Sequence, residues 1–442
     1  MRIGLLCITC VFALFGVARA LAAADGDLDP GFGSNGQVTI VRPQNQTSSS
    51  ITGDVGALAD GRFLWAQATG DFSVFVGRGL ADGSADTNFG GDHSGRVTLT
   101  GCARNANTRL IGYNDGSAVV WAGACLLRVD ANGSVDASFG TGAQPPSSFV
   151  AAGLLASHSG GFVLAGMLGS QWQVYRFAAN GTLDASFGSS GGVSVTIPST
   201  NNLLTLEALA LRDDDRIVLA GSRGNTHGPN LVVAQLSSAG APDPAWNTTG
   251  IVDIEAPSGY QTLYASALRI DRDGSVIVGG RGSNGSVACC LMLTRLDASG
   301  QVMPAFGLRI FPLAGVLGMY SFFENRDALA VLPHGRILFV TTTFPSAVPQ
   351  SAHRTQFTLV RTLADGNLDN TFGNNGWRGF TIADPSASGQ AGDYVQAHAL
   401  AYANGSALLF GRTFFEDNSN GLDYVTLARA RFDDLFADGI GD

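Results

Sequence analysis

The stretch that decides the fold is Gly26-Asp27-Leu28-Asp29-Pro30-Gly31-Phe32-Gly33, close to the start of the chain. Glycine permits tight or left-handed backbone before and after such a motif. The carboxylate of Asp29 can accept a backbone N–H two or three residues further on and so cap a single turn. The side chains of Leu28 and Phe32 can then pack against an apolar core and anchor the turn there. The motif therefore predicts a structural corner, with the aspartate as its cap.

This corner recurs along the whole chain, about 57 residues apart on average, and a regular period of this size is typical of propellers and solenoids. The fifth and sixth copies are expected to be less regular, because Pro242 fills the Leu position and Met303 the Asp position. The remaining Asp positions are Asp29, Asp86, Asp136, Asp184, Asp243 and Asp369. The aromatic positions are Phe32, Phe89, Phe139, Phe187, Trp246, Phe306 and Phe372.

The segments between corners repeat one order of strand patterns. A short alternating strand, such as residues 193–197, follows the aromatic residue and is itself followed by a variable loop. Two strands joined by a tight turn come next, as in residues 208–221, and a fourth strand leads into the next corner. Seven units of four antiparallel strands predict an all-β fold, a seven-bladed β-propeller. A linear β-solenoid is the rival architecture, although its repeats are usually shorter and end in caps.

The motif and its spacing resemble the delta-60 repeat, a family of exported bacterial proteins considered propeller-like. The resemblance covers residues 25–432 and rests on seven tandem copies, with Pro242, Trp246 and Met303 as departures. It implies a propeller fold, a bacterial source and export. It implies no activity, because the family is largely uncharacterised.

Both ends of the chain carry segments outside the repeat. The N-terminus has the pattern of a signal peptide: a positive charge at Arg2, an apolar run over residues 3–17 and mainly small residues over 18–24. We expect a signal peptide over 1–22, a single propeller over 25–432 and a C-terminal tail over 433–442. The tail resembles an ending found on some exported gammaproteobacterial proteins, with Ile440 and Gly441 in place of Phe-Glu. A degenerate eighth corner is the alternative.

The charge of the chain bears on its partners and its compartment. The net charge is −10, and it becomes about −12 once Arg2 and Arg19 leave with the signal peptide. An acidic chain repels phosphate backbones, so we expect no nucleic-acid partner. No later segment is apolar for long enough to span a bilayer. We therefore expect a secreted or periplasmic monomer, with attachment to the cell surface left open.

Four cysteines remain after the predicted cleavage: Cys102, Cys125, Cys289 and Cys290. An even number in an oxidising compartment permits disulfides. One prediction is a bridge between Cys102 and Cys125. The adjacent Cys289 and Cys290 could form a vicinal bridge, remain as two buried thiols, or pair elsewhere.

Familiar site motifs have a structural explanation in this chain. Residues 31–36 match Gly-x-Gly-x-x-Gly but lead into a strand rather than a helix, and residues 188–192 match Gly-x-Ser-x-Gly within a repeat corner. The histidines form no pair at helical spacing and are expected in loops and turns. Oxygen side chains alternate over residues 25–29 and 130–136, as calcium would require, but without an EF-hand pattern. We expect no cofactor and leave calcium open.

Three functional hypotheses follow. The leading one is a binding or surface-interaction module for a protein or glycan ligand, because variable loops on a rigid scaffold usually carry binding. The second is an axial-site enzyme, a hydrolase or lyase acting on glycans, which would need carboxylates from different blades to converge. The third is a purely structural envelope protein. The side chains that line the axial channel should discriminate between them, since paired carboxylates about 5–10 Å apart would favour the enzyme.

Overall fold

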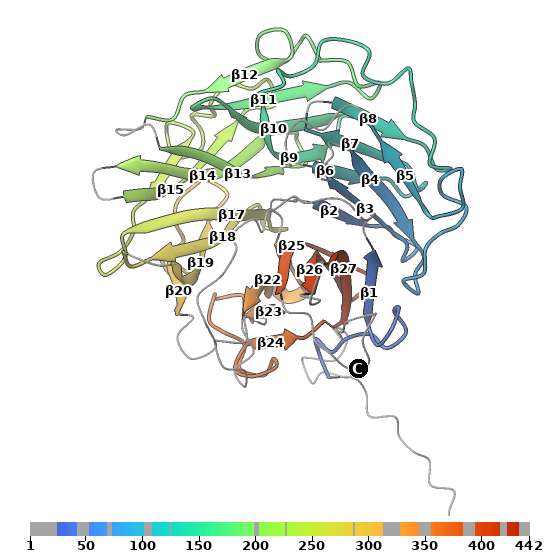
Figure 1. The fold of residues 1–442 in the computed structure, drawn as a ribbon. Coiled ribbons are helices and arrows are strands. Elements are labelled where there is room, and N and C mark those ends of the chain that lie inside the picture. Colours follow the sequence, from blue (N-terminus) through green and yellow to red (C-terminus); the bar gives the residue numbers. More distant parts are fainter. Residues whose placement is uncertain are drawn as a thin grey trace, which may run out of the picture.

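The architecture is a ring of seven antiparallel sheets (Figure 1). The computed structural model describes residues 24–41, 53–68, 73–100, 108–123, 125–198, 203–225, 228–285, 288–312, 328–343, 355–382, 394–415 and 422–432. Within these residues the one helical element is the 3-10 turn Pro333–Gly335, and no helix could cross a membrane. The structure thus confirms the predicted all-β propeller with seven blades.

The blades follow one another along the chain, and blades 1 to 6 each consist of consecutive antiparallel strands. Blade 1 comprises β2 (Gly53–Ala57), β3 (Phe63–Ala68), β4 (Val74–Gly79) and β5 (Arg96–Leu99), and blade 2 comprises β6 (Thr108–Gly112), β7 (Ala118–Ala122) and β8 (Cys125–Val129). Blade 3 comprises β9 (Val150–Ala156), β10 (Phe162–Leu168), β11 (Gln171–Phe177) and β12 (Gly192–Val195), and blade 4 comprises β13 (Leu204–Leu211), β14 (Ile217–Asn225), β15 (Gly228–Leu236) and β16 (Ile251–Ile254).

The remaining blades complete the ring. Blade 5 comprises β17 (Thr262–Ile270), β18 (Val276–Ser283), β19 (Ala288–Leu296) and β20 (Leu308–Pro312), and blade 6 comprises β21 (Leu329–Val331), β22 (Ile337–Thr343), β23 (Gln356–Thr362) and β24 (Trp377–Phe380). Blade 7 comprises β25 (Tyr394–Ala403), β26 (Ser406–Phe415), β27 (Leu422–Arg431) and, from the other end of the chain, β1 (Gln37–Val41).

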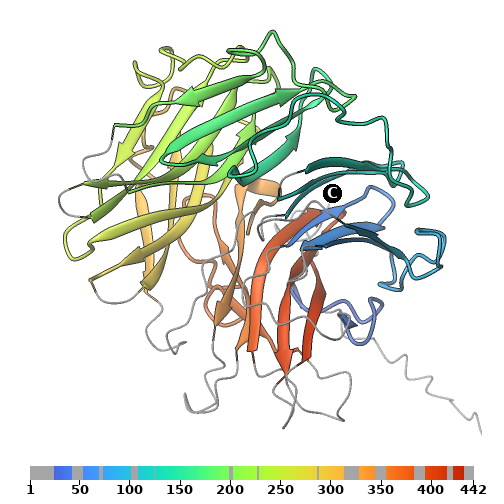
Figure 2. The ribbon, with the colours of Figure 1, turned by 45° about the horizontal axis from the view of Figure 1, so that its top comes forward.

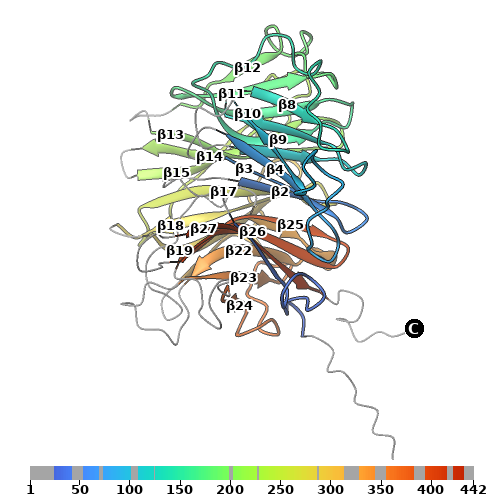
Figure 3. The same ribbon diagram turned by 45° about the vertical axis from the view of Figure 1, so that its right-hand side comes forward.

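The ring is closed by pairing the two ends of the chain. Strand β1 pairs antiparallel with β27, from Gln37 opposite Ala428 to Val41 opposite Tyr424. The first strands of neighbouring blades contact one another all the way round, including β25 with β2. Figures 2 and 3 show the N-terminal strands beside the C-terminal blade. The sequence repeat is therefore shifted by one strand against the blade, because the strand after each corner completes the preceding sheet.

Blade 2 departs from the predicted four strands, since three strands are present among its described residues. The segment that follows Phe139, where other blades form the outermost strand, contains Pro145 and Pro146. Proline has no backbone N–H and cannot donate to a strand ladder. The variation thus has a direct cause in the sequence.

The apolar core lies between blades, rather than in one central mass. The second strands are buried on both faces, as in β3, where all six residues are buried. Phe32, Trp65 and Phe410 belong to one cluster that joins blade 7 to blade 1. Each Å² of apolar surface buried between two blades contributes about 25 cal/mol, so each of these clusters stabilises the fold substantially. The clusters hold neighbouring blades in fixed positions around the axis.

Candidate functional site

The predicted corners lie at the turn between the third and fourth strands of each blade, and their aspartates are structural. In blade 1, Oδ1 of Asp86 accepts the N–H of Asn88, while Oδ2 accepts Nε of Arg78 at 2.8 Å. The Arg78 guanidinium also lies 4.8 Å from the ring centroid of Phe89. Arginine, aspartate and aromatic ring form a buried trio in which every group already has a partner.

The arginine of this trio is a residue that the motif analysis missed. The trio recurs with Arg176, Arg361 and Arg429, which donate Nε to Asp184, Asp369 and Asp29 at 2.8, 2.9 and 2.8 Å. The sequence does hold a signal, because the arginine precedes the corner aspartate by eight residues in blades 1, 3 and 6. In blade 7 the two residues lie 400 positions apart.

The corners of blades 4 and 5 lack one residue of the arginine–aspartate pair, and other polar residues take its place. In blade 4, Gln235 occupies the arginine position, and Arg212 bridges to it from another turn while Gln235 donates to Asp243. In blade 5, Met303 replaces the aspartate, and Nη2 of Arg295 is bound by Asp271 and Asp273 instead. Each buried cation thus keeps a polar partner, as its burial requires.

Hydrogen bonds lower the pKa of Asp29, Asp184 and Asp369 below its ordinary value. For Asp29, burial raises the pKa, but the N–H of Gly31 and the guanidinium of Arg429 more than offset that effect, so the pKa is lowered. Asp29 therefore stays ionised at neutral pH, which is the wrong protonation state for a general acid.

Neighbouring corners are also bonded to one another. The N–H of Gly33 donates to the carbonyl of Asp82 in the next corner, and Gly90 donates to Asn132 in the same way. A β-carbon added at Gly240 would lie 2.9 Å from the ring of Phe187 of the preceding corner, and one at Gly26 would clash with Phe372. The corners therefore join blade to blade as well as strand to strand.

A cavity of about 410 Å³ lies on the axis of the propeller, lined by first strands of six of the seven blades. Its leucines Leu110, Leu154, Leu329 and Leu400 are buried in the core between blades, whereas lining residues such as Leu155, Ile270 and Val331 are half-buried. Asp54 and Arg269 are the charged residues of its lining, and Tyr402 is the aromatic one. The lining thus differs both from a ring of aromatics and amides and from a wall of paired carboxylates.

The one carboxylate of this lining, Asp54, is already engaged by the backbone. Its Oδ1 accepts the N–H of Val55 at 2.8 Å, and its Oδ2 accepts the N–H of Leu110 on the neighbouring blade at 3.0 Å. Asp54 is only 7% exposed. It joins blades 1 and 2 beside the axis.

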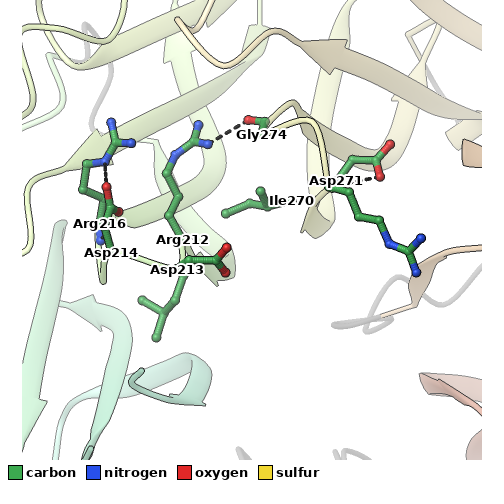
Figure 4. Close-up of a pocket in the computed structure, with 9 residues that line it drawn as sticks. Arg212, Asp213, Asp214, Arg216, Ile270, Asp271 and Gly274 are labelled. Carbon is green, nitrogen blue, oxygen red and sulfur yellow. Dashed lines mark hydrogen bonds and ion pairs between the residues drawn. The ribbon is translucent and has the colours of Figure 1, made fainter. Parts of the chain in front are cut away.

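A second pocket, of about 420 Å³, lies between the first turns of blades 4 and 5 and shares Ile270 with the axial cavity. Figure 4 shows Arg212 reaching across to Gly274, whose carbonyl accepts Nη1 at 2.7 Å, and Arg216 paired with Asp214. Burial, followed by the nearby charge of Arg216, lowers the pKa of Arg212. Charged turns therefore lie next to the axial cavity.

His398 is a further buried polar residue on a first strand. It lies at an irregularity in the pairing of β25 with β26 and is 3% exposed. Neither ring nitrogen has a hydrogen-bond partner. Burial, together with the charges of Arg412 and Arg109, lowers its pKa from 6.5 to about 3. The expectation that the histidines occupy loops and turns was wrong for His398, because a strand residue at a bulge can point into the core.

The cysteines and the suggested calcium ligands have the following surroundings. Cys125 is disulfide-bonded, to a cysteine outside the described side chains, and Cys290 is buried as a thiol. Cys102 and the side chain of Cys289 lie outside the described residues.

The suggested calcium ligands are engaged within the protein. Asp25 pairs with Arg361, while Asp130 accepts the N–H groups of Asn132 and Ser134. Within the described part of the chain, no group of three His, Cys, Asp or Glu could hold a metal.

These features define the chain as a seven-bladed β-propeller with an axial cavity. A family model described as a domain of unknown function (DUF5122) beta-propeller matches residues 168–187, the segment that contains Arg176, Asp184 and Phe187. A search of curated proteins by sequence finds no significant match.

Several solved structures align with much of this chain. The Cps50 (Swd1) β-propeller domain of Myceliophteria thermophila is 11% identical, with 88% of this chain and 99% of that one covered and a TM-score of 0.45. A gluconolactonase of Xanthomonas campestris is 12% identical, with 71% and 82% covered and a TM-score of 0.36. The polysaccharide lyase Uly1 is 9% identical, with 84% and 88% covered and a TM-score of 0.36. At these TM-scores the likenesses carry no inference about function.

Proposed function

We propose that this chain is an exported binding module that holds a small ligand at the axis of its propeller. The observation that carries this proposal is the axial cavity of about 410 Å³, which has the size of a small-molecule pocket. It is lined by first strands that the inter-blade core holds in place. A pocket built on rigid strands needs little reorganisation to bind, and this favours affinity.

The composition of the lining supports binding over glycan hydrolysis. Hydrolysis of a glycosidic bond ordinarily uses two carboxyl groups that flank the bond. The described lining of the cavity offers one, Asp54, and both of its oxygens accept backbone N–H groups. Among the described lining residues, a ligand would therefore meet one carboxylate and not the pair that hydrolysis ordinarily uses.

Native mass spectrometry of the purified protein tests this function. The wild type is expected to retain a noncovalently bound small molecule from the medium of its producing cell and to release it chemically unchanged. Ala401→Trp, which fills the cavity lining, should lose that adduct while keeping its thermal unfolding midpoint. Equal adducts in both proteins, or none in either, would contradict binding at the axis. Release of a chemically altered molecule would favour the enzyme.

Export and family membership form part of the same proposal. The predicted signal peptide over 1–22 lies outside the described residues, and the first described residue is Ala24. The N-terminal mass of the protein recovered from the periplasm or medium should correspond to cleavage close to residue 22. The matched segment 168–187 contains one complete corner with its arginine, which supports assignment to the delta-60 repeat.

A further inference from the structure

A pocket of about 250 Å³ lies at the junction between blade 7 and blade 1, where the two ends of the chain meet. Its described lining comes from the turn that joins β25 to β26, the turn that joins β2 to β3, the end of β27 and the first corner of the chain. Figure 1 shows β27 beside β1 at this junction. We call this pocket the closure pocket. It shares Ala57 with the described lining of the axial cavity and is otherwise separate from it.

Arginines predominate among the charged residues of the closure pocket, although the chain as a whole has a net charge of −10. The charged residues of its described lining are Asp29, Arg62, Arg429 and Arg431. Two further carboxylates lie beside these arginines, since Asp60 pairs with Arg62 and Asp82 interacts electrostatically with Arg429. Both carboxylates are exposed, so water screens their charge. The lining therefore carries an excess of positive charge.

The one carboxylate of this lining, Asp29, is shared by two arginines. Its Oδ2 binds Nε of Arg429 at 2.8 Å and Nη2 of Arg429 at 2.6 Å. Its Oδ1 accepts the N–H of Gly31 at 3.0 Å and lies 2.5 Å from Nη2 of Arg431. Asp29 is nearly fully buried, whereas half of the Arg431 side chain is exposed. Among the described residues, Asp29 is the one ionic partner of Arg431, so a single negative charge serves two cations.

Arg431 occupies a position at which no other blade has a cation. It follows two residues after Arg429, which lies opposite Leu408 as Arg78 lies opposite Leu64 in blade 1. The equivalent residues in blades 1 to 6 are Leu80, Asp130, Ala178, Ser237, Asp297 and Leu363. The repeated blade therefore does not require an arginine at this position.

We infer that the closure pocket binds a small oxyanion, with a carboxylate or phosphate group held by Arg431 and Arg62. A guanidinium group matches two oxygens of either group in planar geometry and binds them through charge-assisted hydrogen bonds. The pocket is smaller than the roughly 300–1,000 Å³ of pockets for drug-sized ligands, which suits an anion of few atoms. Arg62 belongs to blade 1 and Arg431 to blade 7, so the bound anion links the two blades that meet at the closure.

Calorimetric titration of the mature protein with inorganic phosphate and, separately, with succinate tests this inference, while chloride keeps the ionic strength constant. At least one of the two anions is expected to bind at one site per chain, and the tighter one identifies the preferred group. Arg431→Met keeps the apolar stem of the side chain and should weaken that binding by about tenfold or more, as expected for loss of a charge-assisted hydrogen bond. No binding of either anion to the wild type would overturn the inference.

Two further variants keep the result interpretable. Arg62→Met should also weaken binding, and it leaves the contacts of Asp29 with Arg429 and Arg431 in place, so this loss cannot come from an opened ring. It decides the question alone if Arg431→Met does not fold. Arg272→Met removes an exposed arginine elsewhere and should leave the affinity unchanged.

Unchanged binding in both Arg431→Met and Arg62→Met, or an equal loss in Arg272→Met, would contradict the assignment of the anion to the closure pocket. Such a result would leave the axial binding function standing, because that function is judged by the adduct that the wild type retains.

Discussion

Arg361 and Asp369 hold one corner of blade 6 together: Nε of the arginine donates to Oδ2 of the aspartate at 2.9 Å, and both side chains are nearly fully buried. The same guanidinium lies 4.5 Å from the ring centroid of Phe372 and pairs with Asp25, from the segment that closes the ring. One side chain therefore supports both a corner and the closure of the propeller.

Replacing that arginine should destabilise the fold strongly. Arg361→Met would remove the closer of two cations from the buried Asp369 and leave Arg336, whose Nε lies 3.7 Å from the same oxygen. Breaking a buried pair costs about 3–5 kcal/mol, and this sets the upper end of the expected loss. Urea unfolding of the wild type and the variant measures the loss. Arg128→Met is the matched control, because Arg128 and Asp136 are only half-buried in that corner and a much smaller loss is expected. Equal losses would show that the buried pair has no special role.

Glycine at the closure should be more sensitive than glycine in an open turn. Gly26 and Gly160 have nearly the same backbone angle, with φ of 82° and 85°, but only Gly26 has a ring against its α-carbon, that of Phe372. Gly160→Ala should cost about 1 kcal/mol through backbone strain alone. Gly26→Ala should cost clearly more in the same urea unfolding assay. Similar values would mean that Phe372 moves aside without penalty.

The buried histidine should make the protein less stable in mild acid. Its folded pKa of about 3 lies below its ordinary 6.5, so the unfolded chain binds the proton first, and stability falls as pH drops from 6.5 toward 3. At pH 5 the loss relative to neutral pH is about 2 kcal/mol. His398→Leu should remove this component, which urea midpoints at pH 7.5 and 5 would reveal. His158→Leu, at an exposed position, should leave the pH dependence of the wild type intact.

The disulfide at Cys125 should contribute to stability, whereas the Cys290 thiol should not respond to reduction. We predict a loss of about 2–4 kcal/mol on Cys125→Ala, because the cross-link restricts the unfolded chain. A reductant should lower the melting temperature of the wild type and leave that of the variant unchanged. Peptide mapping should identify Cys102 as the partner, and a peptide linked through Cys289 would show that this pairing is wrong.

The sequence was sufficient for the corners, because each is built within one short stretch. The carboxylate of Asp86 accepts the N–H of Asn88, two residues further on, and Phe89 follows three residues after Asp86. The spacing within this short stretch is therefore enough to predict the corner. The arginine of the trio could have been found from its spacing of eight residues in three blades. It stands before the glycine that opens the motif, as Arg78 stands before Gly83, so the motif itself does not contain it. In blade 7 no spacing could reveal the partner, since Arg429 and Asp29 lie 400 residues apart.

The sequence by itself determined the number of blades, the all-β class and the position of each corner, because these depend on patterns that repeat within every unit. Tertiary structure alone decided that β1 completes blade 7, that His398 is buried and that Arg269 lines an axial cavity. These features depend on contacts between strands from different blades. Such contacts arise only when the ring closes and its first strands converge on one axis, and no linear spacing encodes that convergence.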